Sequence, residues 1–546
     1  MDKKSGFLTE FSKLYNFIKQ IFLNGITVGF YKYNYIASIN NQLKHLGGWM
    51  VNLEGIRSLK MDKEPKTFFE INNIFENKIN FNIINDENEI YSSIQKYKNC
   101  QEILDIFGDF SKEKNKYKNT ARKGMIFADT KFIIIIVINK VIPLEDETNG
   151  KYIITDGIGK ISQNLINLTS KIWEKSDINI IPISAIQIRF MGCKGVLAFD
   201  PSLENDYIHV RESQIKFNSD DTALNVCSVA NYKETCLNRQ FIILLSTLGV
   251  KDEIFEKIQK NIVKKYMNLL INSNKNFLNE KSIYNKFKNK FLRFAPIIED
   301  FIKNNINLIN EPFFSQLINV FIYSKLIKMK YSGKIKDNKC VCLMGVIDET
   351  DTLEQDEVYI HLMNNSENNK IDTILEQKVI VYRSPSLYPG DIIKLKAIKN
   401  PSLIHMVNVI VFSKKGKRPT FNKLSGGDLD GDRYFVSFNN EIINNIIDEN
   451  CQPLDDPKYS NKKMEKHNKR NRNSITIIKD SVECMFKTIA NSKVGIICNN
   501  HMAIADISPL KAKDPQCVKL CKYFNTEIDA NKTGEFIDIL DLKKKV

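Results

Sequence analysis

The sequence predicts an α+β protein in which two β-rich segments are separated by a helical segment. Three patterns predict this organisation. Short apolar runs with glycine between them occupy residues 120–235, a helical apolar period follows from 237 to about 330, and short strands return from 340 to 438. At roughly 100–200 residues per domain, a chain of 546 residues allows about three or four such units.

The first β-rich segment contains the most apolar run of the chain, Phe132–Ile138, which we interpret as a buried strand. The run ends at Asn139 and is far shorter than the roughly 18 residues that a membrane-spanning helix requires. Several short strands with glycine between them are typical of a closed barrel or a sandwich.

The helical segment places Ile242, Leu245 and Leu248 on one face, and the second β-rich segment is most naturally a second β-barrel. A lysine-rich stretch between Asp455 and Arg472 lacks apolar periodicity and predicts a basic loop, with binding of a nucleic-acid backbone as the alternative. The predicted boundaries are 1–119 for an N-terminal slab, 120–235 for the first barrel, 236–335 for a helical connector, 336–440 for the second barrel, 441–480 for the basic loop and 481–546 for a C-terminal helical segment.

Composition excludes some classes of protein and leaves the charge ambiguous. Apolar residues make up 43% and charged residues 26%, which excludes a fibrous or wholly disordered chain. Lys and Arg number 79 against 64 Asp and Glu, a net charge of +15. Such a charge favours a polyanionic partner such as nucleic acid, although a lysine-rich coding bias would produce the same excess.

The N-terminus has no long apolar core or small-residue cleavage site, so it does not resemble a signal peptide. The eleven cysteines show no CxxC spacing, and the six histidines complete no zinc motif. We therefore expect an intracellular protein, cytoplasmic or nuclear, with reduced cysteines and no membrane segment.

One acidic cluster carries most of the chemical information. Asp428, Asp430 and Asp432 stand two residues apart, so in an extended strand or tight loop their side chains point to the same side. Such a cluster repels itself unless a cation fills it, and oxygen ligands without His or Cys select a hard ion, Mg²⁺ or Mn²⁺. The neighbouring glycines allow the backbone to bend sharply. The spacing therefore predicts a metal site on these three aspartates.

Other sites with similar residues fit less well. An EF-hand calcium loop would need glycine in place of Arg433 and glutamate in place of Asn439. A haloacid-dehalogenase-like phosphatase would have an apolar strand that leads directly into its first aspartate, followed by Asp-Gly-Thr. Here Gly427 precedes the first aspartate, and Asp432 stands in place of the threonine. A solvated acidic turn remains as the structural alternative. Gly159-Lys160 lacks the other residues of a phosphate-binding loop.

The run Ser425–Asp432 resembles the signature of the eukaryotic cellular RNA-dependent RNA polymerases of RNA silencing. Further runs resemble motifs of the same family, in the same order, over most of residues 35–535. They are Thr155–Ser162, Ser184–Phe190 with Lys194-Gly195-Val196, Asn238-Arg239-Gln240, Met344–Thr350, Arg383-Ser384-Pro385 with Pro389-Gly390-Asp391, Asn499-Asn500-His501 and Lys532-Thr533-Gly534.

This resemblance implies an α+β fold of two double-psi β-barrels bridged by a helical slab, with helical N- and C-terminal elements. It implies that the second barrel holds Mg²⁺ on Asp428, Asp430 and Asp432. By motif position, the first barrel would present three cations to the NTP phosphates across the cleft. These are Arg189, Lys194 and Lys216. The N-terminal extension and C-terminal head of larger family members are expected to be absent or short.

The expected function is RNA-templated RNA synthesis from NTPs on single-stranded RNA by two-metal nucleotidyl transfer, with a double-stranded product for RNA silencing. A Dicer-like nuclease or an Argonaute would be a partner in that process. The alternatives are a single-chain DNA-templated RNA polymerase and a catalytically silent nucleic-acid-binding scaffold. Four cations just before the acidic cluster are candidates to guide RNA or to form a solvated hairpin; they are Lys414, Lys415, Lys417 and Arg418.

Overall fold

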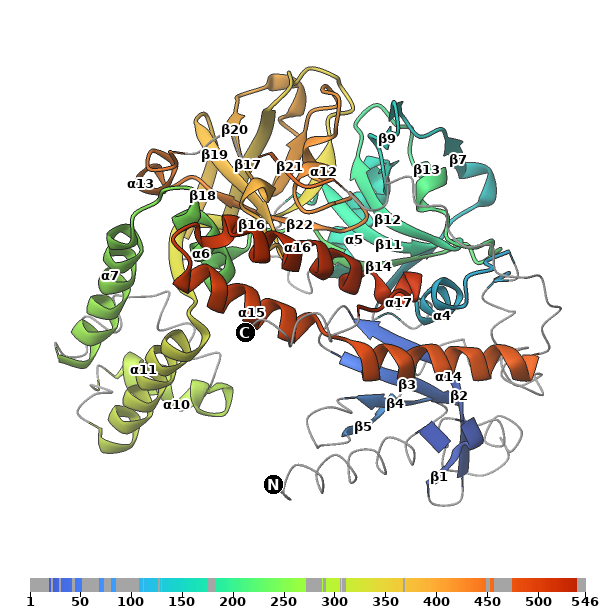
Figure 1. Ribbon diagram of the computed structural model, residues 1–546, viewed down its shortest axis with the longest axis horizontal. Helices are drawn as coiled ribbons and strands as arrows, with labels where there is room; N and C mark the ends of the chain where they lie inside the picture. The colour runs from blue at the N-terminus through green and yellow to red at the C-terminus, as the bar shows by residue number, and fades with distance from the viewer. Residues whose placement is uncertain are drawn as a thin grey trace.

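The computed structural model places the two β-rich segments side by side, with the C-terminal helices packed beneath them (Figure 1). Among the described residues, none of the helices has the length and apolarity needed to cross a membrane. The residues that the structure describes are 19–20, 23–28, 31–41, 45–51, 68–72, 80–84, 108–110, 112–125, 128, 130–173, 182–271, 287, 291–304, 306, 311–366, 369–447, 452–455 and 474–537.

The N-terminal segment contains an antiparallel sheet, which the prediction of helical N-terminal elements missed. In β2, Tyr31, Tyr33 and Tyr35 alternate with polar residues, and this period of two favours a strand. Helix α4 (Lys116–Gly124) follows later in the segment. The strands pair in the order β1-β2-β3-β4-β5, with bounds Ile26–Val28, Tyr31–Asn41, His45–Val51, Phe68–Asn72 and Asn80–Ile84.

The first β-rich segment folds into a seven-stranded mixed sheet, called the first sheet below. Its order is β6-β14-β11-β12-β10-β13-β7, in which β10–β12 and β7–β13 are parallel pairs. Among the described strands no pairing joins β6 to β7, so the sheet is an open path. Helix α5 (Gln163–Trp173) buries Leu165 and Ile166 in the core of this sheet. The strand bounds are Lys131–Ile135 (β6), Val141–Leu144 (β7), Ile158–Ile161 (β10), Ala185–Phe190 (β11), Cys193–Phe199 (β12), Ile208–Arg211 (β13) and Ala223–Val229 (β14).

The prediction that Phe132–Ile138 is a buried strand is wrong in its burial. The strand β6 exists but ends at Ile135, and it lies at the edge of the first sheet. Only Ile133 and Ile136 are buried, whereas the other apolar side chains of the run are exposed, Val137 by 66%. An unbroken apolar run predicts a strand, but it does not reveal whether both faces of that strand are covered.

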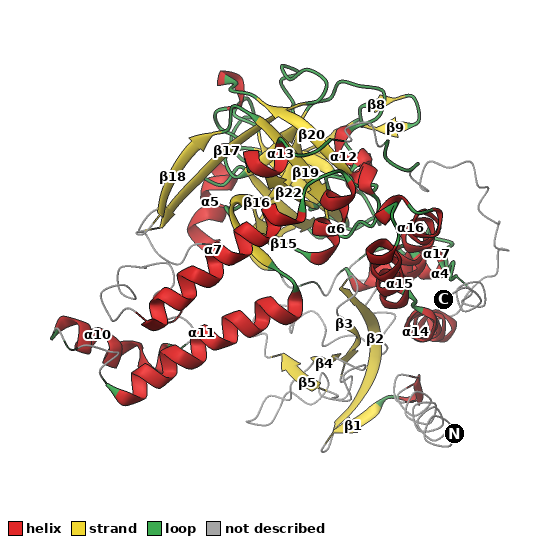
Figure 2. Ribbon diagram, turned by 60° about the vertical axis from the view of Figure 1, so that its left-hand side comes forward, coloured by secondary structure: helices red, strands yellow, loops and turns green. Residues whose placement is uncertain are grey.

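Helices follow the first sheet, as the apolar period predicts. Helix α6 (Arg239–Thr247) packs in the core between the second barrel and the C-terminal helices. Helices α7 (Asp252–Ile271), α10 (Ala295–Lys303) and α11 (Pro312–Ser332) extend away from the sheets, as Figure 2 shows. We call α7, α10 and α11 the helical arm.

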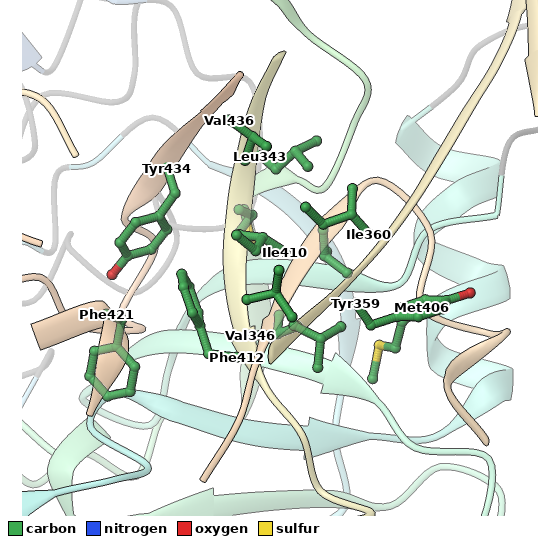
Figure 3. Close-up of a cluster of buried hydrophobic side chains, with 14 of the residues drawn as sticks. Leu343, Val346, Tyr359, Ile360, Met406, Ile410, Phe412, Phe421, Tyr434 and Val436 are labelled. Carbon is green, nitrogen blue, oxygen red and sulfur yellow. The ribbon is translucent and has the colours of Figure 1, made fainter. Parts of the chain in front are cut away.

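The second β-rich segment forms a closed ring of six strands, called the second barrel below. The ring runs β16-β21-β17-β20-β19-β22 and closes through the β16–β22 pairing. Its interior is filled by apolar and aromatic side chains such as Tyr359, Phe412 and Tyr434 (Figure 3). The strand bounds are Ile335–Ile347 (β16), Glu357–Ser366 (β17), Lys378–Arg383 (β19), Ile392–Ala397 (β20), Val409–Phe412 (β21) and Arg433–Ser437 (β22), with β15 (Glu234–Leu237) and β18 (Asn369–Ile374) at the edges.

The C-terminal segment is helical, as predicted. Helix α14 packs against α4 of the N-terminal segment, and α15 packs against α16. The lysine-rich stretch between Asp455 and Arg472 lies, after its first residue, outside the described residues. The helices are α13 (Asn440–Ile443), α14 (Ser474–Asn491), α15 (Val494–Ile507), α16 (Pro515–Ile528) and α17 (Ala530–Thr533).

Candidate active site

The three aspartates lie in a tight loop between α12 (Thr420–Lys423) and β22, which we call the aspartate loop, residues 424–432. Ser425 and Gly431 have positive φ angles, +55° and +123°, which fold the chain back on itself. One carboxylate oxygen from each of Asp428, Asp430 and Asp432 lies within 4.8 Å of the others. The residues that the sequence predicts for a metal site are therefore brought together.

The loop holds its own shape through backbone donors. The N–H of Asp428 donates to Oδ2 of Asp432 at 3.1 Å, and the N–H of Asp430 donates to Oδ1 of Asp428 at 3.3 Å. The hydroxyl of Tyr434 donates to the carbonyl of Asp428 at 2.9 Å. These bonds orient the carboxylates toward one another despite their like charges.

The first sheet holds the same loop from the opposite side. The N–H of Leu429 donates to the carbonyl of Asp156 at 2.9 Å, and Nε2 of Gln187 donates to the carbonyl of Asp430 at 3.1 Å. Gly157, with φ +88°, lies so close that a Cβ there would be 2.7 Å from Cβ of Asp430. The aspartate loop is thus anchored by both β-units.

Two cations pair with the aspartates, one from each β-unit. Nζ of Lys194, on β12 of the first sheet, lies 2.7 Å from Oδ2 of Asp430. Nε of Arg383, at the end of β19 in the second barrel, lies 2.6 Å from Oδ2 of Asp432, and its Nη1 donates to the carbonyl of Ser425. Asp428 receives no such partner among the described ion pairs.

This uneven pairing divides the carboxylates electrostatically. Burial opposes the ionisation of Asp430, but Lys194, followed by Lys216, holds the pKa of that carboxyl below its ordinary value. Burial, and then the charges of Asp430 and Asp432, raise the pKa of Asp428 well above its ordinary value. Asp428 is therefore the carboxylate of the cluster whose negative charge is least balanced by a neighbouring cation. An all-carboxylate donor set with such a deficit fits a hard divalent cation.

The other two cations predicted from the first sheet lie near this cluster. Lys216 donates to the carbonyl of Ser213 at 2.5 Å, and burial lowers its pKa although Asp430, Asp156 and Asp428 oppose that shift. Arg189 lies opposite Lys194 in the antiparallel pairing of β11 and β12, and its positive charge acts to lower the pKa of Lys194. Its Nη1 donates to the carbonyl of Ile188, while its buried Nε has no partner among the described residues.

The four cations that were candidates to guide RNA fall into two groups in the structure. Lys414 pairs with Glu147, which follows β7, at 2.6 Å and with Glu349, which follows β16, at 3.3 Å. Arg418 donates to the carbonyls of Asn422 and Leu454. Lys415 pairs with the exposed Glu354, and Lys417 is exposed. Lys414 and Arg418 thus make structural contacts, while Lys415 and Lys417 lie at the surface.

Glu349 is the centre of the ion pairs that join the two β-units. Its carboxylate lies 2.9 Å from Nη1 of Arg211 and 3.4 Å from Nζ of Lys160, both on the first sheet, in addition to Lys414. Burial opposes its ionisation, but Arg211 and the two lysines hold the pKa of the carboxyl below its ordinary value. We call these contacts the barrel-bridging ion pairs.

Sequence reasoning assigned no role to four residues that the structure brings to the aspartate loop. Arg383 pairs with Asp432, Gln187 and Asp156 bind the loop backbone, and the charge of Lys532 contributes to the low pKa of Asp430. All four lie in sequence runs that resemble motifs of the polymerase family, so their place in these runs is the feature of the sequence that could have identified them.

Comparisons with known proteins agree with this geometry. The family model described as "RNA dependent RNA polymerase" matches residues 3–546. The probable RNA-dependent RNA polymerase 1 of Oryza sativa subsp. japonica is 30% identical over 541 residues, covering 97% of this chain and 63% of that protein. RNA-dependent RNA polymerase 1 of Arabidopsis thaliana is 30% identical over 528 residues, covering 96% and 42%. RNA-dependent RNA polymerase 1 of Schizosaccharomyces pombe is 29% identical, covering 97% and 41%.

A solved structure resembles the fold. The RNA dependent RNA polymerase QDE-1 from Thielavia terrestris superposes with a TM-score of 0.69 at 19% identity, covering 97% of this chain and 58% of that one. The chain therefore spans less than two thirds of the length of each of these proteins.

Proposed function

Because the chain belongs to the RNA-dependent RNA polymerase family, we propose that it synthesises RNA from NTPs on a single-stranded RNA template. The observation that carries the proposal is the convergence of three carboxylates within 4.8 Å, with Lys194 of the other β-unit 2.7 Å from Asp430. Facing acidic and basic groups suit a reaction that transfers a nucleotidyl group from a triphosphate.

Asp428, Asp430 and Asp432 would hold the metal, with Mg²⁺ as the proposed ion and Mn²⁺ as its substitute. The chemistry that a bound pair of such ions supplies in nucleotidyl transfer is activation of the 3′-hydroxyl and stabilisation of the departing pyrophosphate. Burial, and then the charges of Asp430 and Asp432, raise the pKa of Asp428, and a bound cation would offset both effects, which supports this assignment.

The protein's own groups orient the site and balance charge. Arg383 and Lys194 fix two of the three carboxylates, so the ligand set is preorganised. Arg189 lies on β11 beside Lys194, and Lys216 lies in the loop between β13 and β14, close enough for its charge to act on Asp430; both would neutralise the triphosphate and the charge that develops on it. We assign these two side chains to NTP binding.

We also propose how the two β-units are built. Six strands with two parallel pairs, β16–β21 and β17–β20, support a double-psi barrel for the second unit. The mixed first sheet would be its counterpart, with the intervening helices as the bridge. Lys415 and Lys417 would guide RNA, and the double-stranded product would pass to a Dicer-like nuclease or an Argonaute.

The test is incorporation of labelled NTP by the purified chain on a defined single-stranded RNA, with and without primer and Mg²⁺. Asp430→Ala should reduce incorporation to background while the exposed Asp220→Ala retains it. A preference for a single-stranded DNA template of the same sequence would favour a DNA-templated polymerase. Absence of Mg²⁺-dependent incorporation on both templates would favour a catalytically silent nucleic-acid-binding scaffold.

A further inference from the structure

Much of the positive charge of the chain lies in residues 251–336, which contain the helical arm and the segments that join and flank its helices. Residues 251–336 contain seventeen Lys and Arg against seven Asp and Glu, a net charge of +10 out of +15 for the whole protein. A lysine-rich coding bias would spread the excess over the chain. Helix α11 contributes Lys325, Lys328 and Lys330 to this excess and contains no Asp or Glu, so the helix itself is basic.

Helix α11 has one face in the core of the arm and one face open to solvent. Phe314, Ile318, Phe321 and Ile322 are buried, and they recur at the 3–4-residue spacing of one helical face. The opposite face exposes aromatic side chains, of which Tyr323 and Tyr331 are 66% and 70% accessible. The remaining members of the exposed face are Phe313, Gln316, Val320 and Lys330.

This exposed face is held firmly at its C-terminal end. Gly333 ends α11 in the left-handed conformation, and the guanidinium of Arg239 donates to the carbonyls of Tyr331 and Ser332 at 3.1 and 3.3 Å. The backbone of Tyr331 is thus fixed while its ring remains in solvent. From Phe313 to Tyr331 the face is about 27 Å long, at a rise of 1.5 Å per residue.

Exposed aromatic rings among lysines are the combination that binds single-stranded nucleic acid, because unpaired bases stack on the rings while cations neutralise the phosphates. We propose that the exposed face of α11 is a second RNA-binding surface, which takes an unpaired stretch of RNA outside the catalytic centre. The choice of RNA rests on the proposed function, in which a single-stranded RNA is the template. The arm projects away from the sheets that hold the aspartate loop (Figure 2), so this surface is distinct from the catalytic one.

The experiment measures binding of a labelled, unstructured 30-nucleotide RNA to the full chain without NTPs, so that it does not depend on synthesis. The double variant Tyr323→Ala and Tyr331→Ala should weaken binding tenfold or more, whereas Tyr323→Phe with Tyr331→Phe should stay within twofold of the wild type. Lys330→Ala should lower the slope of log affinity against log salt by about 0.7. Phe132→Ala, at an aromatic on β6 that is 53% exposed, is the control outside the arm and should bind normally.

Equal affinity of the alanine double variant and the wild type would overturn the proposal and leave a protein partner as the occupant of this face. A loss of affinity in the phenylalanine variant equal to that in the alanine variant would also contradict it, because stacking would then not be the cause. The two proposals can fail separately. If the chain bound RNA through the arm but incorporated no NTP, the proposed polymerase function would fail while the RNA-binding surface on α11 would stand.

Discussion

Nε of Arg383 lies 2.6 Å from Oδ2 of Asp432, so the last residue of β19 holds one carboxylate of the aspartate loop from within the second barrel. The same guanidinium donates through Nη1 to the carbonyl of Ser425, at the start of the loop. Burial opposes the charge on Arg383, but Asp432 and further anionic groups raise its pKa above the ordinary value. One side chain therefore contacts both the beginning and the end of the loop.

Replacing Arg383 by alanine should remove both of its contacts with the aspartate loop. A buried carboxylate would lose its partner, which costs about 3–5 kcal/mol when one member of a buried pair is removed, and a displaced ligand should reduce NTP incorporation by about 100-fold. Arg383→Lys keeps the charge but not both contacts, so its activity should be intermediate. The exposed Lys396, which pairs with Glu357, provides the control, since Lys396→Ala should change neither stability nor incorporation measurably.

Gly157 should be essential for a steric reason. A Cβ at this position would be 2.7 Å from Cβ of Asp430, so Gly157→Ala should displace the loop and reduce incorporation strongly while the thermal midpoint falls only modestly. Gly150→Ala is the matched control, because Gly150 also has a positive φ, +57°, but open space around it. If both variants lost activity equally, backbone strain rather than the contact with Asp430 would be the cause.

Glu349 should stabilise the junction of the two β-units. Glu349→Gln leaves Lys160, Lys414 and the almost fully buried Arg211 without their common carboxylate, so the free energy of unfolding should fall by about 3–5 kcal/mol. Thermal or denaturant unfolding measures this loss. Glu354→Gln removes the exposed carboxylate that pairs with Lys415 and should be nearly neutral. A neutral Glu349→Gln would show that the barrel-bridging ion pairs contribute no net stability.

Asp391 should make stability depend on pH. Burial raises its pKa to about 7, against the effects of Ser386, Arg418 and Arg383. Between about pH 4 and 7 the folded protein keeps a proton that the unfolded chain has lost, so this contribution is full below pH 4 and is lost as pH rises through 7. From pH 5.5 to 8 the thermal midpoint of Asp391→Asn should therefore rise relative to that of the wild type. The corresponding difference in the free energy of unfolding is on the order of 1.4 kcal/mol per pH unit within the window.

The exposed Asp351→Asn is the control for this measurement, and its midpoint should stay parallel to that of the wild type over the same range. Parallel curves for Asp391→Asn would contradict the assignment, because they would mean that Asp391 is ionised throughout.

The sequence predicts features that depend on local spacing and misses those that depend on tertiary contact. The two-residue spacing of Asp428, Asp430 and Asp432 was sufficient to predict their convergence. The hydrogen bond from Gln187 to Asp430 joins residues 243 positions apart, and no local pattern encodes such a contact. Similarly, the apolar run at Phe132 predicted a strand correctly but not its place at the edge of a sheet, where most of it is exposed.

The bond from Gln187 to the aspartate loop also has a consequence for the synthesis of the protein. At a translation rate of 5–20 residues per second, Gln187 leaves the peptidyl-transferase centre roughly 10 to 50 s before Asp430. During that interval Lys194 of the first sheet has no Asp430 with which to pair. A nascent chain that ends before the aspartate loop therefore lacks the proposed catalytic centre, which forms only when the later segment docks on the first sheet.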